Sequence, residues 1–140
     1  MTTNALYSIA EEKGYQVYGV PLSELKSFAI EKVELTRDSK RLLCLLYKLY
    51  LERVDNGISK SSARYMGGSE HIRQCCLPEE SLENVDDSCW ELLRAGMLDG
   101  FGADDMVCES ELTDQAIIHM ETRFQKGMKE LLEFLANFIP

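Results

Sequence analysis

The sequence predicts a mainly helical α+β domain with one small β-hairpin. Apolar residues recur at helical spacing in several segments that begin at Ser, Thr or Asp and end at glycine. Two short apolar stretches, 97–101 and 106–111, flank a Gly-Ala-Asp-Asp turn and predict the hairpin. The chain has 140 residues, 45% of them hydrophobic, so it can form one compact domain and is too apolar to be disordered throughout.

The N-terminal part, residues 1–35, is predicted to be an appendage to that domain. Residues 4–12 have the spacing of a short amphipathic helix that ends at Gly14. Residues 15–20 alternate weakly between apolar and polar, as an extended segment does.

A longer helix is predicted over residues 39–54, with Asp38 or Ser39 as its cap and Asn56-Gly57 as its end. A helix with one solvent-facing side normally shows a single apolar stripe, whereas this segment is apolar on several sides. We therefore expect it to be buried on more than one side.

Three further helices are predicted to begin at serine caps. Ser59, Ser69 and Ser81 would start helices that extend to residues 65, 76 and 95. After the hairpin, Thr113 would cap a final helix in which apolar residues recur without interruption to the C-terminus, with Gly127 as its only weak point.

The order of these elements resembles that of a winged helix-turn-helix domain over residues 36–126. The most specific segments are Leu92-Leu93-Arg94-Ala95-Gly96-Met97-Leu98 and, after the hairpin, Leu112-Thr113-Asp114-Gln115-Ala116-Ile117. In winged-helix regulators the recognition helix commonly ends with Leu-x-x-x-Gly-(Leu/Met/Ile), and the last helix begins with Leu-Thr-x-x-Gly. This chain has Ala116 at the glycine position of the second motif. The resemblance implies that 81–95 is the recognition helix, that the hairpin is the wing, and that 127–140 extends the last helix.

Two other resemblances cover parts of the chain. Residues 36–126 resemble a family of small proteins from bacterial and phage-like genomes, through segments 36–43, 59–69 and 117–124. Residues 5–31 resemble the N-terminus of ImmA/IrrE-type zinc peptidases. Those enzymes need His-Glu-x-x-His, and the two histidines of this chain, His71 and His119, stand outside any such motif, so no active site is transferred.

Charge is unevenly distributed along the chain, whose net charge is −9. Residues 37–73 carry a net charge of +4, and residues 74–122 carry −12. An acidic excess of this size argues against a general binder of polyanions, because contacts to phosphate need Lys and Arg. It also predicts a negative field over any surface built from the second segment.

The sequence predicts neither an enzyme nor a cofactor or metal site. His71 and Cys75 stand four residues apart on a predicted helix and could share a metal with Cys76 or His119. Zinc, however, usually has four ligands that include a Cys-x-x-Cys or His-x(3–5)-His pair, and the chain has neither. Ser23 and Lys26 have the Ser-x-x-Lys spacing without its partner motifs, and no glycine-rich phosphate loop is present. Five cysteines, an odd number without a secretion signal, indicate reduced thiols in a cytoplasmic protein, and no apolar run is long enough for a membrane span.

The predicted recognition helix carries the main functional hypothesis. Its acids, with Asp104 and Asp105 at the hairpin tip, would face DNA phosphates, so the leading prediction is a regulatory or adaptor module that acts through protein contacts. The predicted partner-binding residues are Glu83, Asp86, Asp87, Trp90 and Arg94. Trp90 is either a contact residue for that partner or is covered by the N-terminal segment or a second subunit.

DNA-binding transcriptional regulation is the alternative. The residues available for contact with nucleic acid are Arg37, Lys40, Arg41, Lys60, Arg64 and Arg73.

A homodimer is predicted as well, because a domain this small cannot easily cover the apolar sides of 39–54 and the apolar C-terminal stripe. The residues expected at the subunit contact are Leu43, Tyr47, Tyr50, Met128, Leu131, Leu135 and Phe138.

Overall fold

The structure is a computed structural model that describes residues 34–138. The chain divides into two units, Met1–Glu34 and Leu35–Pro140, and every described helix and strand belongs to the second. The predicted helix at 4–12, the predicted extended segment at 15–20 and the peptidase-like segment at 5–31 lie outside the described residues.

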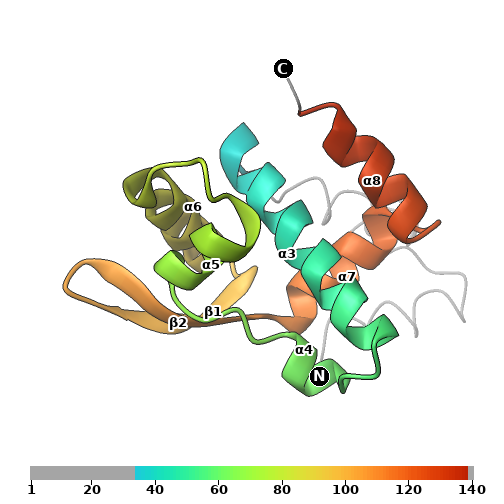
Figure 1. Cartoon of the computed structure of the whole chain (residues 1–140), viewed down its shortest axis with the longest axis horizontal. Coiled ribbons are helices and arrows are strands. Elements are labelled where there is room, and N and C mark those ends of the chain that lie inside the picture. The colour runs from blue at the N-terminus through green and yellow to red at the C-terminus, as the bar shows by residue number, and fades with distance from the viewer. Residues whose placement is uncertain (1–33, 139–140) are drawn as a thin grey trace, which may run out of the picture. The chain divides into compact units, whose positions relative to one another are not determined.

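The predicted fold class, mainly helical with one hairpin, is confirmed (Figure 1). The elements in chain order are α3 (Arg37–Asp55), α4 (Lys60–Ala63), α5 (Ser69–Cys76), α6 (Leu82–Arg94), β1 (Leu98–Ala103), β2 (Met106–Leu112), α7 (Asp114–Arg123) and α8 (Met128–Ala136).

Helix α3 is the central element of this unit. Thr36 caps it, since the Thr36 hydroxyl accepts a hydrogen bond from the backbone N–H of Ser39, so the helix begins earlier than predicted. Helices α5, α6, α7 and α8 all contact α3, and Figure 1 shows them around it. Leu42 and Leu46 are fully buried at its centre, which explains why the segment is apolar on several sides.

The prediction of one unbroken C-terminal helix is wrong. Helix α7 ends at Arg123, and Gly127 adopts a φ of +78°, a left-handed conformation that a helix interior does not allow. The chain turns there and continues as α8, which packs along α3. The apolar spacing continues across the break because the apolar sides of both helices face the same core.

The burial of α3 also corrects the predicted subunit contact. Leu43, Tyr47, Tyr50 and Leu131 are each at most 5% exposed, and their helices α3 and α8 pack against each other. These four side chains are therefore not free to contact a second subunit. Met128, Leu135 and Phe138 are partly exposed.

Strands β1 and β2 form an antiparallel hairpin with a bulge between Phe101 and Gly102. Asp104 and Asp105 form its turn with φ values of 53° and 61°, the backbone typical of tight hairpin turns. On its other side, β2 forms a β-bridge with Tyr65, supported by hydrogen bonds from Met66 N to the Ser110 carbonyl (2.8 Å) and from Leu112 N to the Arg64 carbonyl (3.0 Å). Strand β2 is thus paired on both sides.

Candidate interaction surface

Helix α6 begins as predicted, at Ser81, whose hydroxyl accepts a hydrogen bond from the backbone N–H of Asn84 at 3.1 Å. Val85, Cys89 and Leu92 are buried on its core side. The side chains that remain exposed on this helix are those of Glu83, Asn84, Asp87 and Arg94.

Asp86 was predicted to lie on the partner-binding surface, and that prediction is wrong. Its side chain is buried, with an exposed fraction of 8%. The Asp86 carboxylate accepts hydrogen bonds from the Ser69 hydroxyl (2.6 Å) and from the backbone N–H of Val107 (2.9 Å). Asp86 therefore joins α6 to α5 and β2, and its desolvated charge is compensated by these donors.

Trp90 packs against the hairpin of its own chain and stays partly exposed, and neither predicted role included this contact. The indole Nε1 donates to the Asp86 carboxylate (3.1 Å) and to the Asp105 carbonyl (3.3 Å). A Cβ placed on Gly102 would lie 2.5 Å from the Trp90 ring, so only glycine allows strand β1 to approach this closely. Trp90 thus links the hairpin to α6.

Glu91 is also engaged within the chain. Its carboxylate accepts hydrogen bonds from the backbone N–H (2.7 Å) and the hydroxyl (3.0 Å) of Thr36, the residue that caps α3. Partial burial opposes ionisation of Glu91, but the hydrogen bonds from Thr36 outweigh it and lower the pKa. Two of the four carboxylates that the sequence placed on the surface of α6 are therefore occupied by internal contacts.

The outer face of the hairpin, which sequence reasoning missed, presents aromatic and acidic side chains together. We call it the acidic aromatic face, and its members are Tyr65, Asp99, Phe101, Glu109 and Glu111. Phe101 is 61% exposed and Tyr65 is 48% exposed. The only sequence signal for this face is the alternation Asp99-Gly-Phe101 in one strand and Glu109-Ser-Glu111 in the other.

The pairing of the strands fixes the geometry of this face. Glu111 lies opposite Asp99 on one side and is bridged by Tyr65 on the other, and Phe101 lies opposite Glu109. The Tyr65 hydroxyl donates a hydrogen bond to the Glu109 carboxylate, which raises the pKa of the phenol. These side chains, with Gly100 and Ser110, line a shallow depression of about 170 Å³.

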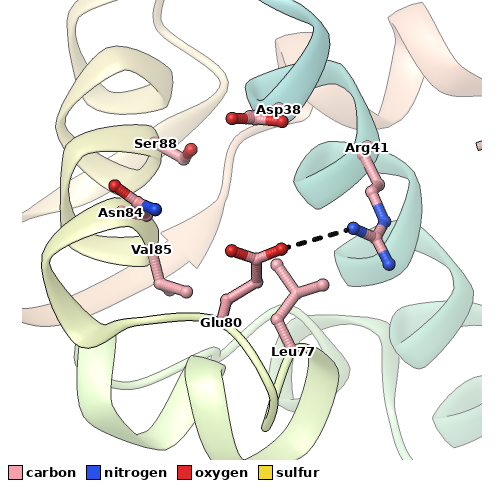
Figure 2. A pocket seen from close by; sticks show the side chains of 7 residues that line it. All are labelled: Asp38, Arg41, Leu77, Glu80, Asn84, Val85 and Ser88. Carbon is pink, nitrogen blue, oxygen red and sulfur yellow. Dashed lines mark ion pairs between the residues drawn. The ribbon is translucent and has the colours of Figure 1, made fainter.

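A second depression lies between the N-terminal turns of α3 and α6 (Figure 2). It has a volume of about 10 Å³, which is room for roughly one water molecule. Arg41 and Glu80 pair within it at 3.7 Å. The close-packed walls leave no space there for a ligand.

The structure does not gather the six predicted nucleic-acid contacts into one surface. Arg37, Lys40 and Arg41 lie in the first turns of α3, a helix about 27 Å long, and Lys60 and Arg64 lie near its other end. Three of the six are paired within the chain, in the ion pairs Arg41–Glu80, Arg64–Asp114 and Arg73–Glu70.

The cysteines and histidines are candidate metal ligands, and the cysteines are also candidate reactive thiols. The Cys75 sulfur lies 3.6 Å from His71 Nε2, but among residues 34–138 no group of three His, Cys, Asp or Glu side chains is arranged to hold a metal. Burial raises the pKa of Cys44 to about 12 and that of Cys89 to about 11, so both remain protonated, inert thiols.

Within the described residues, no helix combines the length and apolar composition that crossing a membrane requires. The sequence matches no protein-family model, no curated protein and no solved structure.

Proposed function

We propose that the chain is a non-enzymatic regulatory or adaptor module of winged-helix type that acts through protein contacts. The element order from α3 to α7, with the hairpin between α6 and α7, supports the winged-helix assignment. Five free cysteines, all within the described part of the chain, suit a cytoplasmic location because they need a reducing compartment.

One observation carries the choice of protein contacts over DNA. Between Arg94 and Arg123 the sequence has no Lys or Arg, and this stretch contains the whole hairpin. The exposed acids there include Asp99, Asp104 and Asp105, which would face the phosphates of any duplex that the hairpin approached. Phe101, by contrast, is an exposed apolar side chain of the kind that protein interfaces cover.

DNA-binding regulation remains a second candidate, supported by a specific finding on α6. Because Asp86 and Glu91 are engaged internally, the exposed acids of that helix are reduced to Glu83 and Asp87. Asn84 and Arg94 are exposed beside them and are residue types that read base edges.

A DNA-binding measurement at several salt concentrations separates the two candidates. We expect the full chain to show no sequence-specific binding to a pool of random duplexes by fluorescence anisotropy. Specific binding that Arg94→Ala abolishes, and that Arg41→Ala with Arg64→Ala leaves intact, would establish the second candidate.

Affinity capture tests the leading proposal directly. The full chain is compared with Phe101→Ser on the hairpin and with Glu79→Gln, at an exposed acid outside every candidate surface, as the control. We expect bound proteins to be lost with Phe101→Ser and retained with Glu79→Gln. Equal capture by all three chains would exclude the hairpin as the contact surface.

We also propose a homodimer, now with a narrower contact. On α8, Leu132 is 45% exposed, and Met128, Leu135 and Phe138 are partly exposed. These side chains are the ones that a second copy could cover, since the buried side chains of α3 are already enclosed.

A further inference from the structure

We infer that the acidic aromatic face binds an arginine-bearing segment of a partner protein. This inference rests on the proposed function and adds the chemistry of the partner. It starts from Phe101 on the hairpin and Tyr65, which is bridged to β2, each with about half or more of its surface exposed.

The charges of the face identify the occupant. Asp99 and Glu111 stand directly opposite each other across the strand pair, and like charges in such positions destabilise a sheet. Glu109 adds a third carboxylate, and none of the five residues of the face is Lys or Arg. The neighbouring Arg53 guanidinium donates instead to the backbone carbonyls of Ala63 and Tyr65, and it forms none of the ion pairs among the described residues. A cationic group seated between the carboxylates would remove this repulsion, whereas a nucleic acid or an acidic peptide would add to it.

The aromatic rings favour arginine over lysine. A guanidinium is planar, stacks on an aromatic ring and can pair with a carboxylate through two parallel hydrogen bonds. Phe101 and Glu109 face each other across the strands, so a ring and a carboxylate are available side by side. The depression of about 170 Å³ beside them is large enough for one such head group.

Internal contacts already hold part of this face in place. The Tyr65 hydroxyl contacts the Glu109 carboxylate, and the backbone bridge between Tyr65 and Glu111 holds the segment at Tyr65 beside β2. A partner side chain therefore meets a Glu109 carboxylate that is already oriented before binding, which favours affinity.

The test uses the full chain labelled with ¹⁵N and a short synthetic Gly/Ser peptide that carries two arginines. Matched peptides carry lysine or glutamine in their place. We expect the arginine peptide to shift amide signals of residues 98–112, the lysine peptide to bind more weakly, and the glutamine peptide to have no effect.

Variants connect the binding to the face. Phe101→Ala and Glu111→Gln should each weaken binding by about tenfold, the loss expected when one stacking or charged contact is removed. Glu79→Gln, at an exposed acid outside every candidate surface, should leave binding unchanged. Both hairpin positions are exposed, so these chains should fold, and thermal unfolding confirms it.

Several outcomes would overturn the inference. These are equal binding of the glutamine peptide, signal shifts on other surfaces, unchanged affinity in both hairpin variants, or no binding at millimolar peptide. Shifts that depend on protein concentration alone would assign the face to a second copy of this chain. If the peptide fails while captured proteins still depend on Phe101, the proposed function stands and only the partner chemistry is wrong.

Discussion

The indole nitrogen of Trp90 donates a hydrogen bond to the carboxylate of Asp86, one turn earlier on α6, at 3.1 Å. Both side chains face the hairpin, Asp86 through the backbone N–H of Val107 and Trp90 through the carbonyl of Asp105. The pair therefore fixes the hairpin, and with it the acidic aromatic face, on the rest of the unit.

Removal of the Asp86 carboxylate should destabilise the protein. Asp86→Ala leaves the Ser69 hydroxyl and the Val107 N–H without partners in a buried place, at a cost of about 2–4 kcal/mol in the free energy of unfolding. Urea unfolding followed by circular dichroism measures it. Asp87→Ala, the exposed neighbour, is the control and should change stability by less than about 0.5 kcal/mol. Equal effects at the two positions would contradict the assigned role of Asp86.

Gly102→Ala should loosen the hairpin. The added Cβ would collide with the Trp90 ring and with the Met106 carbonyl, and overpacking of this kind costs about 1–3 kcal/mol. Trp90 is the only tryptophan, so its fluorescence reports directly on exposure of the ring. Combining Gly102→Ala with Trp90→Phe should recover part of the loss, because the smaller ring leaves room. Strictly additive effects in this double-mutant cycle would show that the two residues do not meet.

Glu91 should give stability a dependence on acid pH. Its pKa is lower in the folded chain than in the unfolded one, so its stabilising contribution is complete above the unfolded pKa and is lost as pH falls through the folded pKa. Glu91→Gln should therefore lower stability at neutral pH and flatten the decline between about pH 5 and pH 3. Denaturant unfolding at a series of pH values tests this, with Glu83→Gln as the control on the same helix. A wild-type slope in Glu91→Gln would refute it.

Substitutions at two neighbouring leucines on α8 should separate packing within the chain from dimerisation. Leu131 is fully buried and Leu132 is 45% exposed. Leu131→Asp should unfold the chain or cost several kcal/mol, since it buries a charge without a partner. Leu132→Asp should leave thermal stability of the single chain nearly unchanged and should shift a dimer toward monomer in light scattering. A wild-type chain that is monomeric at tens of micromolar would remove the homodimer from the proposal.

Local signals in the sequence predicted the helix starts well. Ser59, Ser81 and Thr113 cap their helices as expected, because a cap depends only on the next few residues. Ser69 is different. It is the first residue of α5, whose cap is Gly68, and its hydroxyl donates to Asp86 instead. That contact joins α5 to α6, so the residues next to Ser69 in the sequence cannot predict it.

The site was harder to predict because its contacts are distant in sequence. A helical projection places Asp86 and Trp90 away from the apolar side of α6, which is correct, but it cannot show that the hairpin returns to cover them. The acidic aromatic face likewise depends on the hairpin register and on the bridge from Tyr65. Gly127 was a weak point in the predicted helix, but the regular apolar spacing before and after it favoured one continuous helix, so the break was not predicted.

Because β2 is paired on both sides, only β1 presents an open edge of the hairpin among the described residues, and an open edge matters for aggregation. Among residues 34–138, β1 has no strand neighbour on its second edge, and an open edge with an exposed Phe101 is the kind of template on which identical chains stack. The bulge between Phe101 and Gly102 breaks the regular spacing of that edge, and Asp99 places a charge on it. The hairpin can therefore display an apolar side chain to solvent while it resists edge-to-edge polymerisation with its own copies.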